Sequence, residues 1–305
     1  MINFKSKTFA LFSIIAANVI YGVNYVVAKA IMPTYFSPLS IIFLRIAGTI
    51  IICLFIFLLF VKEKVNKKDY LRLIIASLFG ISLNQIMFFE GLNLTTPIDS
   101  AIIMTINPII VLIFSFIFLK DKITILKLLG ILLGIIGAVM IILGKGEISF
   151  NFDTFTGNVL IFINATSFAL YLIVIKPLMN KYHPITIMLW TFTLGFIFSL
   201  PFTIKPLINT NFSIIPSDIW LGLAYIVIGS TFLGYLLYNY SLRVLSPTIV
   251  SYFIYLQPLF STITTMIVFG DKPGIIDFIS AFLIFSGVWF VSMKPSDIKL
   301  KKVEI

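Results

Sequence analysis

Ionisable residues in or beside long apolar runs are the first candidates for chemistry, because a charge in hydrocarbon needs a partner or a water-filled cavity. Arg45 lies about two helical turns beyond Pro38, deep in an apolar run. Glu90 and Asp99 lie near a junction between the next two runs and are acids available to Arg45. We interpret these three residues, with Lys29 near the end of the first run, as charge-pairing or gating residues. A static ion pair that only holds helices together is the alternative interpretation.

Neutral polar and aromatic side chains recur at steps of three or four residues in several runs, which puts them on one face of a helix. An unpaired polar group in hydrocarbon is costly, so such a face is expected to line a cavity or to pack against another helix. A tyrosine in mid-run can contact an amphipathic solute through its ring and its hydroxyl. The candidate solute-binding residues are Tyr21, Asn24, Asn84, Asn107, Asn164, Tyr171, Tyr235, Tyr238, Tyr255 and Gln257.

Catalytic and metal-binding chemistry have little support in this sequence. His183 is the one histidine and lies at a junction beside Pro184, while Cys53 is the one cysteine and lies in an apolar run. A metal site, a histidine-based catalytic triad and an intrachain disulfide are therefore not expected. Neither a Gly-x-Ser-x-Gly motif nor a phosphate-binding Gly-rich loop occurs, so enzymatic activity, a cofactor and direct use of ATP are not expected either.

The composition is that of an integral membrane protein, with 60% hydrophobic residues, 11% charged residues and a mean hydropathy of +1.11. Apolar runs of roughly 20 residues, the length that crosses a bilayer as a helix, recur from end to end. We predict an all-α integral membrane fold with ten transmembrane helices. They cover residues 8–31, 38–61, 70–90, 97–119, 123–143, 157–180, 184–204, 217–241, 247–269 and 274–293.

The chain contains a repeat with an offset of 150 residues. Two apolar runs are each interrupted by an amide and a proline, Asn107-Pro108 and Gln257-Pro258, and 258 − 108 is 150. The Asp-Lys pair that ends each run keeps the same offset, which indicates two homologous halves. A proline in mid-helix frees a backbone carbonyl and permits a kink, so Pro108 and Pro258 are predicted to act as hinges.

The distribution of basic residues predicts the topology. With ten helices, seventeen Lys and Arg residues fall on the side of the N-terminus and four on the other side, so both termini are expected in the cytoplasm. Five spans are an odd number, so the halves should form an inverted repeat, as in many secondary transporters. The predicted parts are a first five-helix repeat at 1–143, an extracytoplasmic linker at 144–156, a second five-helix repeat at 157–293 and a cytoplasmic basic tail at 294–305.

Several short motifs occur in an order that is typical of a known family. They are Tyr21-Gly22-Val23-Asn24-Tyr25 with Lys29, Pro38 with Arg45, Pro108, and Leu129-Gly130 with Gly137. Together they resemble the drug/metabolite transporter superfamily, in its ten-helix EamA type, over nearly the whole chain. The sequence departs from that pattern at Tyr21, where tryptophan is usual, and at Asp121 and Asp271, where glutamate is usual. Thr191 stands where a second-half equivalent of Arg45 would fall, which suggests that the halves no longer do the same job.

The resemblance implies a secondary transporter that exports a small metabolite, an amino acid or a drug-like solute by alternating access. A passive channel or facilitator is the alternative, and an intramembrane enzyme is a further one that the missing motifs disfavour. The expected partners are a small-molecule solute and the lipid bilayer, and not nucleic acid. Proton coupling through Glu90 or Asp99 and the formation of a homodimer are left open. The expected location is the bacterial plasma (inner) membrane, which the protein would cross several times.

Overall fold

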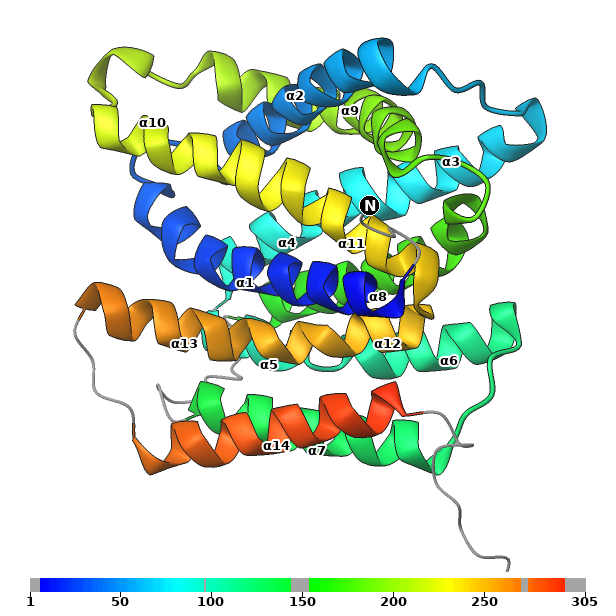
Figure 1. The fold of residues 1–305 in the computed structure, drawn as a ribbon. Helices are drawn as coiled ribbons and strands as arrows, with labels where there is room; N and C mark the ends of the chain where they lie inside the picture. Colours follow the sequence, from blue (N-terminus) through cyan, green and yellow to red (C-terminus); the bar gives the residue numbers. More distant parts are fainter. Residues whose placement is uncertain (1–5, 96, 144–153, 270–273, 294–305) are drawn as a thin grey trace, which may run out of the picture.

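The computed structural model describes residues 6–95, 97–143, 154–269 and 274–293, which fold into helices packed side by side (Figure 1). Within those ranges no strand occurs. The first half contains α1 (Lys7–Ile31), α2 (Pro38–Ile56), the π-helix η1 (Phe57–Val61), the 3-10 helix η2 (Lys67–Asp69), α3 (Tyr70–Ser77), the π-helix η3 (Leu78–Ser82), α4 (Leu83–Leu94), α5 (Pro97–Met104), α6 (Asn107–Leu119) and α7 (Ile125–Leu143). The second half contains α8 (Phe155–Met179), α9 (Pro184–Ile208), the 3-10 helix η4 (Phe212–Ile214), α10 (Ser217–Ala224), the π-helix η5 (Tyr225–Leu233), α11 (Gly234–Val244), α12 (Pro247–Tyr252), the 3-10 helix η6 (Phe253–Tyr255), α13 (Leu256–Phe269) and α14 (Ile275–Ser292).

Several helices begin where local sequence signals require it. α2, α9 and α12 each begin at a proline, whose missing N–H is not needed in the first turn. The side chains of Ser37, His183 and Ser246 cap these helices by accepting a backbone N–H two or three residues later. The starts expected at residues 38, 184 and 247 are therefore observed.

Nine stretches of the described residues are long and apolar enough to cross a membrane. They correspond to nine of the ten expected spans. The remaining one, 247–269, is divided into α12, η6 and α13, and the span expected at 97–119 is divided at residues 105–106. The protein is thus an all-helical, multi-pass membrane protein over the described ranges, and the count of ten spans stays a prediction. The expected tail 294–305 and most of the expected linker 144–156 lie outside the described residues.

Two π-helices occupy related positions in the two halves, which the sequence did not indicate. Adding 150 to the residues of η3 gives 228–232, which lie inside η5. A π-helix has a wider turn than an α-helix and often marks a functional site. In η3 the carbonyl oxygens of Phe79 and Gly80 accept hydrogen bonds from Ser167 and Tyr235 of the second half.

Helix packing follows the same repeat. α1 packs against α11 and α13, and its repeat counterpart α8 packs against α4 and α6. α7 and α14 pair at one edge of the molecule, and α2 and α9 pair near the opposite edge (Figure 1). A Cβ on Gly130 would lie 2.7 Å from the carbonyl oxygen of Gly287, and one on Gly137 would lie 2.8 Å from that of Ser280, so α7 and α14 are antiparallel. The 150-residue offset exchanges these two contacts, as a two-fold axis would.

Candidate functional site

The two helix breaks meet between the halves. The first is the turn at Thr105 and Ile106, between α5 and α6, and the second is η6, which ends at Tyr255. The Tyr255 hydroxyl donates a hydrogen bond to the carbonyl oxygen of Thr105 at 2.9 Å, and 255 − 105 is again 150. Pro108 and Pro258, the predicted hinges, lie in the first turns of α6 and α13. Proline is tolerated there because the first N–H groups of a helix have no partner within the helix.

The amides before these prolines tie each break to the opposite half. Asn107 Nδ2 donates to the carbonyl oxygen of Ala165 in α8 at 2.6 Å. Gln257 Nε2 donates to Asn18 Oδ1 in α1 at 2.9 Å. Both amide nitrogens, which we expected to contact a solute, are therefore engaged within the protein in this structure. The Asn107 amide oxygen is buried without a described partner.

Arg45 is a buried cation between the halves, with 7% of its surface exposed. Its Nε donates to the Thr231 hydroxyl in η5 at 2.8 Å. Its guanidinium carbon lies 5.3 Å from the centroid of the Phe89 ring in α4, a distance that gives a favourable cation–π contact. The described contacts of Arg45 include neither Glu90 nor Asp99, which we expected as its partners.

Four of the expected tyrosines lie in two ring contacts, and two of the four, Tyr21 and Tyr235, lie near Arg45. The ring centroids of Tyr21 and Tyr238 are 6.5 Å apart, and so are those of Tyr171 and Tyr235. Tyr21 and Tyr171 are repeat counterparts, since 171 − 21 is 150. The structure thus brings candidate residues from α1, α2, α8 and α11 together.

Three of these tyrosine hydroxyls have acceptors within the protein. Tyr171 donates to Asn239 Oδ1 at 3.1 Å, Tyr235 to the Gly80 carbonyl at 3.2 Å and Tyr238 to the Val250 carbonyl at 3.4 Å. For Tyr21 no such hydrogen bond is found among the described residues. Its hydroxyl is therefore the one of the four that keeps its donor available.

Gln85 in α4 belongs to the same region, although our sequence-based candidates did not include it. It lies next to the Tyr235 hydroxyl and is 3% exposed. Within the described part of the chain, neither its amide oxygen nor its amide nitrogen has a hydrogen-bond partner. The repeat could have indicated Gln85 as a candidate, because adding 150 to 85 gives 235, the position of the candidate Tyr235. Nothing in the sequence could have indicated Phe89, because the chain has 32 phenylalanines and this residue type is too common to be informative. We name as the Arg45 cluster the residues Tyr21, Arg45, Gln85, Phe89, Thr231 and Tyr235.

The remaining neutral candidates lie in helix contacts or beside them. Asn164 Nδ2 donates to the Asn84 carbonyl at 2.7 Å, and Asn84 Nδ2 donates to the Asn164 carbonyl at 3.5 Å, which joins α4 to α8. The amide oxygens of Asn164 and Asn24 are buried without described partners. Asn24 therefore keeps unused hydrogen-bonding capacity, while the pair of Asn84 and Asn164 contributes to helix packing.

The other charged candidates differ in burial. Asp99 in α5 is fully buried, and Glu90 in α4 is half-buried. The side chain of Lys29 lies outside the described part of the structure. Among the described residues, the recorded salt bridge is at another place and joins Lys181 Nζ to Asp69 Oδ1 at 2.9 Å.

This salt bridge belongs to a polar network at the helix ends. Asp69 also accepts a hydrogen bond from the Tyr182 hydroxyl at 2.8 Å. The backbone N–H of His183 donates to Glu63 Oε2 at 2.9 Å. The network joins the segment before α3 to the segment before α9, and so connects the two halves at these helix ends.

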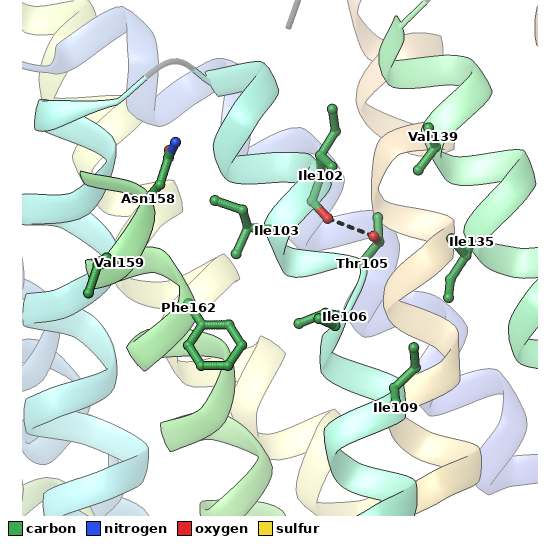
Figure 2. Close-up of a pocket in the computed structure, with 10 residues that line it drawn as sticks. All are labelled: Ile102, Ile103, Thr105, Ile106, Ile109, Ile135, Val139, Asn158, Val159 and Phe162. Carbon is green, nitrogen blue, oxygen red and sulfur yellow. Dashed lines mark hydrogen bonds between the residues drawn. The ribbon is translucent and has the colours of Figure 1, made fainter. Parts of the chain in front are cut away.

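A cavity of about 550 Å³ lies between α5, α7 and α8, and its walls are mostly isoleucine and valine (Figure 2). Its lining contains none of the Arg45 cluster. The Thr105 hydroxyl, one of its polar groups, donates to the Ile102 carbonyl at 2.6 Å (Figure 2). Such an apolar cavity offers little to orient a polar solute. The Arg45 cluster is therefore the better candidate for solute binding.

Comparisons with known proteins agree with this architecture. Residues 8–143 and 155–293 match the model of the EamA-like transporter family. The uncharacterized transporter YyaM of Bacillus subtilis (strain 168) is 29% identical over 83% of this chain and 84% of its own length. YetK of the same organism, also an uncharacterized transporter, is 26% identical over 95% of this chain and 88% of its own length. A solved structure titled only as the crystal structure of a protein has the same fold, with a TM-score of 0.76 at 15% identity over 94% of this chain and 98% of its own.

Proposed function

Because the chain belongs to the EamA-like transporter family, we propose that it is a secondary transporter that moves a small solute across the membrane by alternating access. The family and the names of the relatives point to a transporter and not to an enzyme. Export of a metabolite, an amino acid or a drug-like solute is part of the proposal and rests on the family resemblance.

One arrangement carries the proposal: two homologous halves bring their broken helices into contact, and a buried polar cluster also takes its side chains from both halves. In transporters built from repeats, solute sites lie at the repeat interface near discontinuous helices. Here the Tyr255–Thr105 hydrogen bond joins the two breaks. The Arg45 cluster draws side chains from α1, α2 and α4 of the first half and from η5 and α11 of the second. Movement of one half against the other would therefore change both the breaks and the cluster.

We also propose ten membrane-spanning segments in two inverted halves, with both termini in the cytoplasm and the protein in the bacterial plasma membrane. The antiparallel contact of α7 with α14 supports opposite orientations of the halves. Lys7 Nζ donates to the Ser292 carbonyl at 3.3 Å, which supports placing the start of α1 and the end of α14 on one side. The excess of Lys and Arg on that side argues that it is cytoplasmic.

Counterflow into proteoliposomes tests the proposal. Vesicles containing the purified protein are loaded with one unlabelled solute, and uptake of the radiolabelled form is followed for amino acids, small organic cations and monocarboxylates. A carrier gives saturable uptake that the internal solute accelerates, because the loaded site returns faster than the empty one. A channel gives flux that is neither saturable nor accelerated. Flux no greater than in empty vesicles for every solute, from a protein shown to be folded, would rule out transport of these classes.

An imposed pH gradient tests proton coupling in the same vesicles. If the gradient drives uptake, a titrating acid is required, and Glu90→Gln and Asp99→Asn are the first variants to compare. Uptake that does not depend on the pH gradient would exclude proton coupling, and a facilitator or an exchanger would remain as the possible mechanisms.

A further inference from the structure

Arg45 carries a positive charge that no carboxylate balances among the residues that the structure describes. It lies seven residues inside α2, in a buried position, so its side chain is not at a helix end from which it could reach water. Among the described residues, the recorded acceptor for Arg45 is the Thr231 hydroxyl, which takes its hydrogen bond from Nε. The two terminal nitrogens, which form the planar fork of the guanidinium, have no described acceptor. Charged groups inside membranes normally pair with each other or face a solute pathway.

The neutral groups beside Arg45 have unused hydrogen-bonding capacity as well. Neither amide atom of the buried Gln85 forms a hydrogen bond of normal length with a described residue, although the amide lies beside the Tyr235 hydroxyl. A buried polar group without a hydrogen bond is destabilising, so a site with several of them is expected to receive a polar ligand or water. Tyr21 adds a hydroxyl that lies against Gly234, the residue before Tyr235, and that has no described acceptor. The available groups are thus mostly hydrogen-bond donors around one positive charge.

We propose that the Arg45 cluster binds the carboxylate of a monoanionic solute, with the guanidinium fork on the two carboxylate oxygens and the Gln85 amide and Tyr21 hydroxyl as further donors. This inference rests on the proposed transport function and names the class of solute. Guanidinium and carboxylate match in geometry, and such bidentate charge-assisted pairs are among the stronger hydrogen bonds. The neighbouring rings of Phe89 and Tyr235 suit an apolar or aromatic body on the solute.

One negative charge fits this site better than two. Arg45 supplies a single positive charge, and Lys176, another basic residue in a membrane span, has its ammonium bound to the carbonyl oxygens of Leu242 and Leu245. A phosphate monoester would bring a second negative charge that no described group neutralises. The cluster is therefore expected to prefer a monocarboxylate to a phosphate ester of similar size.

Calorimetric titration of the full chain in nanodiscs tests this with matched probes. Phenylacetate and hexanoate are compared with their amides, phenylacetamide and hexanamide, and with phenyl phosphate. The wild-type protein is expected to bind at least one acid about tenfold or more tightly than its amide, because the amide cannot pair with Arg45. Arg45→Gln is expected to abolish this preference and leave the amide affinity unchanged. Arg72→Gln, which removes an exposed arginine, is the control and keeps the preference.

Gln85→Leu keeps the test decisive if Arg45→Gln does not fold. The Gln85 amide lies beside the Tyr235 hydroxyl and forms no hydrogen bond of normal length with a described residue, so this variant loses at most that weak polar contact and is expected to fold. Its carboxylate affinity is nevertheless expected to fall several-fold. An unchanged affinity in Gln85→Leu, equal binding of acid and amide by the wild type, no binding of either acid, or tighter binding of phenyl phosphate would each overturn the inference.

Counterflow separates this failure from failure of the proposed function. If Arg45→Gln still exchanges a neutral or cationic solute at the wild-type rate, the protein is a transporter but the carboxylate assignment is wrong. If no solute exchanges with the wild type, the proposed function itself falls.

Discussion

Arg45 and Lys176 are both basic residues in membrane spans, yet their surroundings give them different roles. Lys176 Nζ donates to the carbonyl oxygens of Leu242 and Leu245 at 2.6 and 3.0 Å, so its donors are used on the backbone. Arg45 donates from Nε to the Thr231 hydroxyl, and its two terminal guanidinium nitrogens have no described acceptor. At the scale of single residues, the question for each polar group is therefore how much of its hydrogen-bonding capacity the protein already uses.

His183 gives a prediction for pH at this scale. Burial holds the pKa of the His183 imidazole below its ordinary value of 6.5, Arg243 lowers this pKa further, and Glu63 acts in the opposite direction. The unfolded chain takes up the proton near pH 6.5 and the folded chain only at lower pH, so stability is lost as the pH falls through 6.5 and levels off below the folded-state pKa. In the folded state His183 Nδ1 accepts the Ile185 N–H at 3.3 Å, and protonation of Nδ1 would break this cap.

His183→Asn tests this prediction, because asparagine can cap α9 but does not titrate in this range. Between about pH 7.5 and about pH 5.5, the Tm of the wild type is expected to fall more than that of His183→Asn. Equal losses of Tm in the two proteins would show that His183 does not contribute to the pH dependence.

At the scale of elements, the end of α11 depends on a side chain from α8. The last carbonyl groups of a helix have no partner within the helix, and a cation there also interacts favourably with the helix dipole. Lys176→Met removes the ammonium and keeps the apolar stem, so the free energy of unfolding is expected to fall by about 2–3 kcal/mol. Thermal denaturation measures the loss, and hydrogen exchange should increase near Leu245. Lys64→Met, at an exposed position, is the control, and similar Tm values for the two variants would refute the capping role.

At the scale of the whole molecule, the pairing of α7 with α14 is separate from the Arg45 cluster. A Cβ on Gly287 would lie 2.6 Å from the Gly130 carbonyl oxygen and would also meet the Tyr252 hydroxyl, so α14 would have to move away from α7. Gly287→Ala is therefore expected to cost about 1–3 kcal/mol of stability and to leave solute affinity within about twofold. Gly274→Ala, whose Cβ would lie 3.7 Å from its nearest neighbour, is the matched control. A large change in solute affinity in Gly287→Ala with normal stability would contradict the view that the pairing of α7 with α14 is separate from the Arg45 cluster.

Local properties of the sequence were enough to determine much of this protein. Apolar length and helical spacing depend on segments of about 20 residues, so they predicted the membrane class and nine helical stretches that are long and apolar enough to cross a membrane. Proline and capping residues predicted the starts of α2, α9 and α12. The 150-residue offset predicted two related halves. The short motifs predicted the EamA family, and the family model confirms this family.

Tertiary structure alone decided which polar groups are already satisfied. Asn107 and Gln85 are both amides in apolar runs, but the Asn107 nitrogen binds a carbonyl of α8, while both amide atoms of Gln85 are without described partners. A helical face that packs against a neighbour and one that meets a solute have the same spacing, so the sequence cannot distinguish them. The difference depends on how helices distant in sequence are rotated and cross, as when Arg45 meets Thr231 and Phe89 instead of the acids expected from the sequence.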